Sequence, residues 1–121
     1  MAAEQGDGGA QYNLAEIYYI GKDVPNNYRL AFRWYLKAST STFNDDTNAM
    51  AFQNLGNMSE GGEGTIKDYV RAHMWYNIGA MYSGGVNETL RELLEEQMTS
   101  LQIQEAQKLA RECVAKDYKD C

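Results

Sequence analysis

The stretch that decides the fold is residues 10–38, AQYNLAEIYYIGKDVPNNYRLAFRWYLKA, because the chain contains a second copy of its pattern. Residues 51–79, AFQNLGNMSEGGEGTIKDYVRAHMWYNIG, align with it without a gap. Eight of the 29 aligned positions are identical, and the two tryptophans of the chain, Trp34 and Trp75, fall at the same position. A sequence period of about 40 residues is typical of proteins built from stacked supersecondary units.

Each copy has the pattern of two helices separated by a turn. In the first copy Leu14, Ile17 and Tyr18 recur at i, i+3 and i+4, which is the spacing of one helix face. A break that contains glycine follows in both copies. Asn27 and Asp68 then stand where a side-chain oxygen caps the first turn of a second helix. We therefore predict a helix hairpin in each copy.

The second helix of each hairpin combines aromatic and small residues on one face. That face consists of Ala31, Trp34, Tyr35 and Ala38 in the first copy and of Ala72, Trp75, Tyr76 and Gly79 in the second. The small residues let helix axes approach closely, and we predict that the two tryptophans form equivalent wedges between successive hairpins. Such a hairpin does not cover its own apolar face, so the hairpins are expected to stack.

Residues 86–117 have the pattern of a third helix pair. Leu90, Leu93, Leu94 and Met98 give the first of its helices an apolar face. Thr99 with Gln102 has the spacing of a capping box before the second. The outward positions of that last helix are charged, at Glu105, Lys108, Arg111, Glu112 and Lys116. We predict that this pair closes the stack and turns a polar face to water.

Composition narrows the range of partners. The formal charge is −6, and the eleven Lys and Arg residues are scattered along the chain. Nucleic acid is not an expected partner, because phosphate binding needs a clustered basic surface. The acidic balance also disfavours anionic membrane surfaces. No stretch approaches the roughly 20 apolar residues that a membrane span needs.

Both copies match one repeat pattern, each at most of its positions. It comprises Ala10, Gln11, Leu14, Tyr18, Gly21, Val24, Asn27, Tyr28, Ala31, Trp34, Tyr35 and Ala38 in the first, and Ala51, Leu55, Gly56, Gly62, Gly64, Asp68, Tyr69, Ala72 and Trp75 in the second. This set resembles the Sel1-like repeat, a bacterial type of tetratricopeptide-related α-solenoid. Ala15 and Asp23 depart from it by replacing glycines, and Phe52 stands where glutamine is usual.

The resemblance covers nearly the whole chain and implies both fold and function. It implies an all-α protein, an α/α right-handed superhelix of about three antiparallel helix pairs. The implied function is scaffolding of protein complexes, without catalytic residues, cofactor or metal. Within one domain, residues 1–121, we assign residues 10–42 and 49–82 to two repeats and residues 86–117 to a capping pair. Residues 2–9 resemble the tail of a preceding repeat, which indicates a chain trimmed from a longer one.

Cys113 and Cys121 are the only cysteines of the chain. In one continuous helix they would lie about 12 Å apart, too far for a disulfide, whereas a helix that ends near Lys116 lets the following segment fold back. A cysteine-rich, exported branch of the resembled family joins cysteines at this spacing. That implies a Cys113–Cys121 disulfide and an extracytoplasmic location, periplasmic or secreted. Two free thiols in a cytoplasmic protein are the alternative.

Residues that might suggest catalysis or a metal have simpler interpretations. His73 is the only histidine, and neither Tyr69 at i−4 nor Asn77 at i+4 is a metal ligand, so we expect a structural or solvent-facing role. We interpret a run of acidic residues as a solvated helix face; the run is Glu88, Glu92, Glu95 and Glu96. The sequence has no nucleophile motif and no phosphate-binding loop.

The candidate binding surface lies on the first helices of the repeats, which line the concave face of stacked helix pairs. Tyrosine adds contact area at low entropic cost, and neighbouring polar groups suit hydrogen bonding to a peptide. The predicted partner-binding residues are Tyr12, Glu16, Tyr19, Phe52, Gln53, Asn57 and Glu60. For Tyr19 and Phe52, packing against neighbouring repeats is an equal alternative.

Three functions stay open at this point. The first is a module that presents this acidic, tyrosine-bearing surface to a partner protein or peptide. The second is a cell-envelope enzyme acting on cell-wall or β-lactam compounds, as the resemblance allows, although a nucleophile constellation is missing. The third is self-assembly, in which Leu14 and Tyr18, exposed at the N-terminal repeat edge, stack on another copy of the chain.

Overall fold

The computed structural model describes residues 7–41, 44–83, 85–119 and 121. Within these ranges the chain is helical and forms no strand, as the sequence predicts. The helices are α1 (Gly8–Ile20), α2 (Tyr28–Ser39), α3 (Asp45–Gly61), α4 (Tyr69–Tyr82), α5 (Val86–Glu95) and α6 (Ser100–Ala115).

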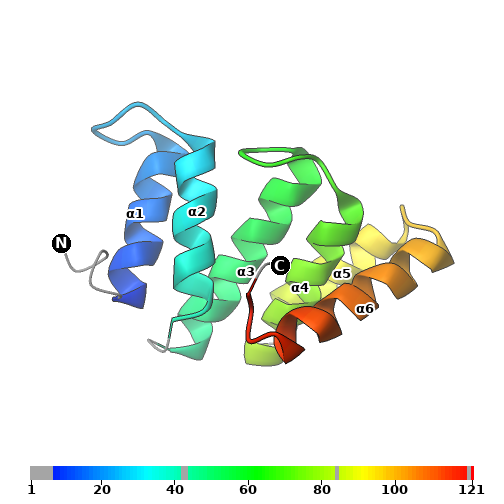
Figure 1. Ribbon diagram of the computed structural model, residues 1–121. Coiled ribbons are helices and arrows are strands. Elements are labelled where there is room, and N and C mark those ends of the chain that lie inside the picture. The colour runs from blue at the N-terminus through cyan, green and yellow to red at the C-terminus, as the bar shows by residue number, and fades with distance from the viewer. Residues whose placement is uncertain (1–6, 42–43, 84, 120) are drawn as a thin grey trace.

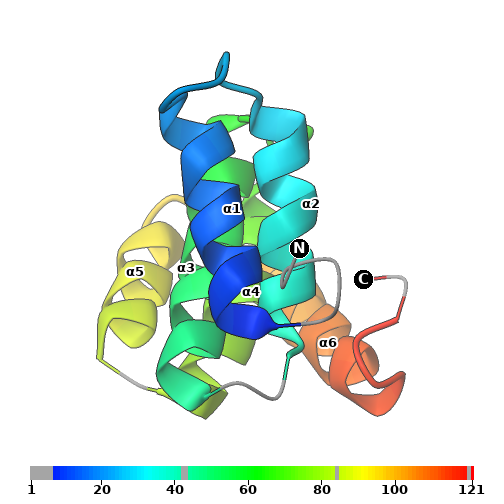
Figure 2. The same ribbon diagram turned by 90° about the vertical axis from the view of Figure 1, so that its left-hand side faces the viewer.

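From α1 to α5, helices that follow one another in the chain stack side by side (Figure 1). α1 pairs with α2 and α3 with α4, while α2 packs against α3 between the pairs. Seen along the stack, α1, α3 and α5 lie on one side and α2 and α6 on the other (Figure 2). The third pair is more open than the first two, because α5 and α6 both pack against α4 and make little contact with each other. The chain is an all-α solenoid, as predicted.

The turns of the two repeats share the same backbone hydrogen bonds. The Asn27 amide donates to the Tyr18 carbonyl at 2.8 Å, and 41 residues later the Asp68 amide donates to the Ser59 carbonyl at the same distance. Each preceding helix ends at a glycine in the left-handed conformation. The side chains of Asn27 and Asp68 cap the following helices by accepting a backbone N–H at 3.1 and 3.0 Å. The predicted hairpins and caps are confirmed.

The last helix begins and ends close to the predicted positions. Thr99 and Gln102 form the capping box, each side chain accepting the backbone N–H of the other residue. α6 ends at Ala115, and the chain then turns back so that Cys113 and Cys121 form a disulfide with their Cα atoms 5.5 Å apart. The structure therefore contains the predicted disulfide rather than two free thiols.

The two tryptophans occupy equivalent repeat positions in unequal surroundings. Trp75 is 4% exposed and stacks on Phe52 with 5.9 Å between the ring centres. Trp34 is only half-buried, and the Lys37 ammonium group lies 4.4 Å from its ring centre. The prediction of equivalent wedges is wrong, because Phe52 and Cys121 border Trp75, whereas Trp34 lies at a partly exposed position beside Lys37.

Small residues set the distance between paired helices, as predicted. Ala15, Ala31 and Ala72 are fully buried, and Gly56 is buried in α3. A methyl group on Gly56 would overlap the ring of Tyr76. Tyr76 is itself 0% exposed and its hydroxyl is held by Asn57 and Glu60, so a shift of the ring would break these contacts.

We expect Gly56→Ala to lower the free energy of unfolding by about 1–3 kcal/mol through this overlap. Gly61→Ala is the matched control in the same helix, because its methyl group would lie 3.6 Å from the flexible Glu63 side chain. That control should change stability by about 0.5 kcal/mol or less. Urea denaturation followed by circular dichroism measures both values. Equal unfolding midpoints for the two variants would contradict the close approach at Gly56.

Several tyrosine hydroxyls are held in the neutral form by burial. Desolvation, followed by the charge of Glu16, raises the pKa of Tyr12 to about 12. Burial is also the first cause that raises the pKa of Tyr35, Tyr76 and Tyr82 above the usual 10. The folded state therefore binds these phenolic protons more tightly than the unfolded state does.

The sign of this linkage predicts alkaline sensitivity. The contribution of the neutral tyrosines to stability is complete below the unfolded pKa of about 10 and is lost as the pH rises towards their folded pKa values. We expect the urea midpoint to stay level between about pH 7 and 9 and to fall steeply above about pH 10. Tyrosinate absorbance should rise together with the loss of helical signal. Complete ionisation of all tyrosines near pH 10 with the helices intact would contradict this expectation.

Candidate binding surface

The predicted binding residues of α1 and α3 are mostly half-buried at the surface, and Asn57 is exposed. Six side chains are partly or fully exposed, and we call them the α1–α3 face: Tyr12, Glu16, Tyr19, Gln53, Asn57 and Glu60. The outward position predicted for Phe52 is wrong, because it is 0% exposed and stacks on Trp75 and Tyr82. A helix turns by about 100° per residue, so position 52 points into the core while Gln53 reaches the surface.

Tyr12 links α1 to α3. Its hydroxyl accepts a hydrogen bond from Asn54 Nδ2 at 2.9 Å. Its ring packs edge-on against Tyr35 of α2, with the ring centres 5.5 Å apart. The ring contact explains why Tyr12 is half-buried. The hydrogen bond with Asn54 means that this predicted surface tyrosine also joins the two repeats.

Tyr19 holds an acidic side chain of the next turn in place. Its hydroxyl donates to both carboxylate oxygens of Glu63, at 3.0 and 3.1 Å. Its ring lies 5.1 Å from that of Tyr28, measured between centres. Burial, then the bond to Glu63, raises the pKa of Tyr19. Packing against the neighbouring repeat, one of the two roles considered for Tyr19, is therefore present.

Asn57 and Glu60 both accept a hydrogen bond from a second tyrosine hydroxyl, that of Tyr76. The Tyr76 O–H lies 2.7 Å from Asn57 Oδ1 and 3.0 Å from Glu60 Oε1. A pocket of about 310 Å³ opens beside these groups between α3, α4 and α5. Its lining residues are Asn57, Glu60, Gly61, Tyr69, Tyr76, Leu90 and Gln97.

The sequence did not identify the surface role of Glu63, which accepts from the Tyr19 hydroxyl, or of Tyr76, whose hydroxyl donates to Asn57 and Glu60. Glu63 lies in a turn, and Tyr76 belongs to the apolar stripe of its helix, so neither position carries a local signal of a surface role. A repeat comparison does not reveal them either, because Glu63 aligns with Lys22 in the first repeat. Only the contact across the repeats brings Tyr19 and Glu63 together.

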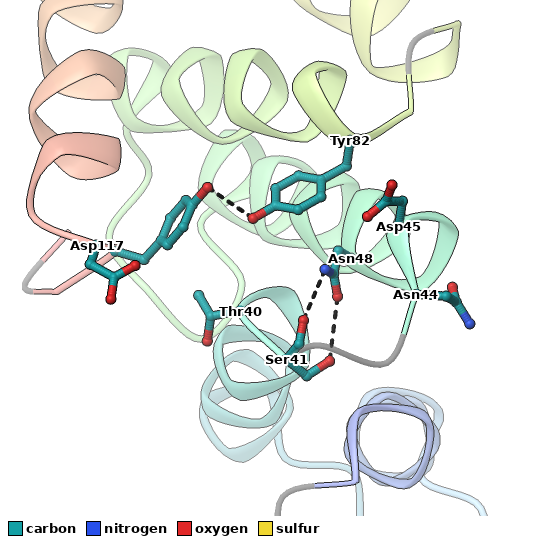
Figure 3. A pocket seen from close by; sticks show the side chains of 8 residues that line it. Thr40, Ser41, Asn44, Asp45, Asn48, Tyr82 and Asp117 are labelled. Atoms are coloured by element: carbon teal, nitrogen blue, oxygen red, sulfur yellow. Dashed lines mark hydrogen bonds between the residues drawn. The ribbon is translucent and has the colours of Figure 1, made fainter.

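A polar pocket of about 600 Å³ lies where α2 ends and α3 begins (Figure 3). Ser41 and Asn48 bond to each other on its wall, and the Tyr82 hydroxyl donates to that of Tyr118 at 2.8 Å. Its lining residues are Thr40, Ser41, Asn44, Asp45, Asn48, Tyr82, Asp117 and Tyr118. The sequence did not predict this pocket, because four separate segments form its wall.

The residues considered for catalysis or metal binding have structural roles. His73 is fully buried, and its Nε2 lies 2.7 Å from Glu95 Oε2, so the structural alternative is confirmed. The other members of the acidic run, Glu88, Glu92 and Glu96, are exposed, as predicted. Among the described residues, no group of three or more His, Cys, Asp or Glu side chains is placed to hold a metal ion. No helix in the described ranges is long and apolar enough to cross a membrane.

Comparisons with known proteins agree with this architecture. The crystal structure of c5321, a protective antigen present in uropathogenic Escherichia coli strains displaying an SLR fold, is similar with a TM-score of 0.83 and 26% sequence identity. The similarity covers 97% of this chain, which spans only 25% of that protein's chain. No curated protein sequence matches this chain.

The model of the Sel1 repeat matches residues 8–42 and 50–82. These two matches include both helix hairpins that the sequence predicts, with both tryptophans, and together span more than half of the chain. The chain therefore belongs to the Sel1 repeat family.

Proposed function

We propose that the chain is a protein-interaction module and that its α1–α3 face holds a segment of a partner protein. The observation that carries this proposal is that buried or half-buried tyrosine hydroxyls fix carboxylates at this face. Tyr19 donates to Glu63, and Tyr76 donates to Glu60. Each carboxylate keeps further lone pairs that accept hydrogen bonds from a ligand.

This arrangement lowers the entropic cost of binding. Side chains that are already ordered by packing lose less rotamer freedom when a ligand arrives. Tyr12 and Tyr19 are ordered by ring contacts, and Glu60 and Glu63 by hydrogen bonds. The fixed groups are carboxylates on a chain of formal charge −6, so the complementary ligand is a basic segment of a partner.

The family assignment supports the same function, because Sel1 repeat proteins generally act as scaffolds for protein interactions. The alternative of a cell-envelope enzyme has no observation in its favour. The one histidine of the chain, His73, is fully buried against Glu95 and is therefore not available as a general base for a substrate.

Removal of two carboxylates from the face tests the proposal. We expect Glu16→Gln with Glu60→Gln to weaken binding of a basic partner segment about tenfold, because two charges and their hydrogen bonds to the ligand are lost. Proteins that bind to the immobilised parent protein are first identified by mass spectrometry. Their dissociation constants are then measured with purified proteins by calorimetry.

The matched control is Glu88→Gln with Glu105→Gln, which removes the same charge from exposed positions of α5 and α6. This control should bind as the parent does, and both double variants should keep the parental helical signal. Equal weakening by the two pairs would mean that only net charge matters, and retained affinity in the Glu16 and Glu60 variant would refute the proposed face.

We also propose that the protein has an extracytoplasmic location. The Cys113–Cys121 disulfide supports it, because disulfides persist in oxidising compartments such as the periplasm and are reduced in most cytosols. Periplasmic and secreted locations are equally compatible with this argument.

Self-association through the N-terminal edge is a second candidate, favoured by a comparison of equivalent repeat positions. Leu55 and Met58 in the second repeat are 0% and 1% exposed, because the first repeat covers them. Of their counterparts in the first repeat, Leu14 is half-buried and Ile17 is 37% exposed. The N-terminal edge thus presents the same apolar positions without a described neighbour, and a second copy packing edge to edge would cover them.

Light scattering over a range of concentrations tests this second candidate. We expect the parent to approach the mass of a dimer at high concentration and Ile17→Glu to remain monomeric, because a charge then lies in the apolar contact. Ile66→Glu is the control, since Ile66 is 84% exposed and lies in the turn of the second repeat. A parent that stays strictly monomeric at its highest soluble concentration would dispose of the N-terminal edge as an interface.

A further inference from the structure

The segment that follows α6 lies over an aromatic cluster. The Tyr118 ring contacts Phe52 and Tyr82, with ring centres 6.1 and 6.5 Å apart. Its hydroxyl accepts a hydrogen bond from that of Tyr82 at 2.8 Å. Cys121 lies beside Trp75, and the Arg71 side chain donates to the Cys121 carbonyl. The end of the described chain thus covers the side of the core that faces away from the α1–α3 face.

Cavities border this segment on both sides. Tyr118 separates the polar pocket of about 600 Å³ from an apolar pocket of about 290 Å³. The apolar pocket shares Leu36, Trp75 and Cys121 with a third pocket of about 360 Å³. Together they describe one groove along α2 and α4, divided by Tyr118 and Cys121. The segment is therefore laid into a groove rather than sealed into a close-packed core.

The backbone of the segment is strained, and it is held by hydrogen bonds, by the ring contacts of Tyr118 and by the disulfide. Asp117 and Tyr118 adopt φ values of 55° and 63°, the left-handed conformation that disfavours residues other than glycine. The Tyr118 amide donates to the Cys113 carbonyl at 2.8 Å, and the covalent link is the disulfide. Closing so short a loop by a disulfide shifts the balance between docked and released forms on the order of a hundredfold.

We propose that the Cys113–Cys121 disulfide is a redox-sensitive strap that keeps this groove closed. A small-molecule dithiol supplies two electrons and two protons, the S–S bond breaks to give two thiols, and the dithiol becomes a cyclic disulfide. The strained segment then leaves the groove and exposes the aromatic cluster of Phe52, Trp75 and Tyr82. The reverse exchange with the cyclic disulfide form of the dithiol takes up those two electrons and two protons, re-forms the S–S bond and restores the closed form.

The two cysteines differ in a way that confines the opening to the strap. Cys113 is 1% exposed in α6, where it belongs to the same core cluster as Ala110 and Ile78. As a thiol it remains a small apolar side chain in that core. α6 stays docked because its contacts with α4 do not depend on Cys121. Reduction therefore frees the segment after α6 and leaves the helices in place.

The test uses Trp75 as the reporter in a Trp34→Phe variant of the full chain. We expect the acrylamide quenching constant of Trp75 to rise at least threefold when dithiothreitol reduces the disulfide, while the helical signal is unchanged. In the reduced, folded protein, iodoacetamide should alkylate Cys121 at least tenfold faster than the buried Cys113, as followed by mass spectrometry of peptides.

A variant that lacks both sulfurs controls for the reductant. Cys113→Ala with Cys121→Ala, in the same Trp34→Phe background, should show the high quenching constant with and without dithiothreitol. A low quenching constant in the folded double variant or in the folded reduced protein would overturn the proposal, because the segment then stays docked without the bond. Loss of the helical signal on reduction would also overturn it, since the disulfide would then hold the fold itself.

Discussion

The burial of Phe52 against Trp75 and Tyr82 is the contact on which the rest of the structure depends, and Tyr118 lies over it. These rings come from α3, α4 and the segment after α6, so one side chain connects the second repeat with the end of the chain. In a solenoid each unit contacts only its neighbours, and stability is close to a sum of such interfaces. A single shared aromatic cluster therefore couples elements that the repeat pattern alone would leave independent.

Local physics explains which features were predictable from the sequence. Hairpins, caps and glycine turns depend on residues a few positions apart, such as Asn27 and the third residue after it. The capping box of Thr99 and Gln102 is of the same kind. The position of the Cys113–Cys121 bond followed from a helix end and a family resemblance, and the structure agrees.

Contacts between distant segments were not predictable in the same way. A shift of one residue separates buried Phe52 from partly exposed Gln53, and periodicity alone does not fix a helix face that closely. The hydroxyl contact of Tyr19 with Glu63 joins residues 44 positions apart. The open arrangement of the third pair was not predictable for the same reason. It depends on the packing of α5 and α6 against α4 rather than against each other.

The two ends of the stack differ, and this difference gives the solenoid a direction. Charged, exposed side chains of α6 such as Glu105 and Arg111 meet water at one end, whereas apolar Leu14 and Ile17 remain partly open at the other. Charged outer faces resist stacking, while half-covered apolar positions favour it. The carboxylates Glu60 and Glu63 lie at neither end, because both belong to the second repeat in the middle of the stack. The proposed association through Leu14 and Ile17 and the proposed recognition of a basic partner by Glu60 and Glu63 therefore draw on different side chains.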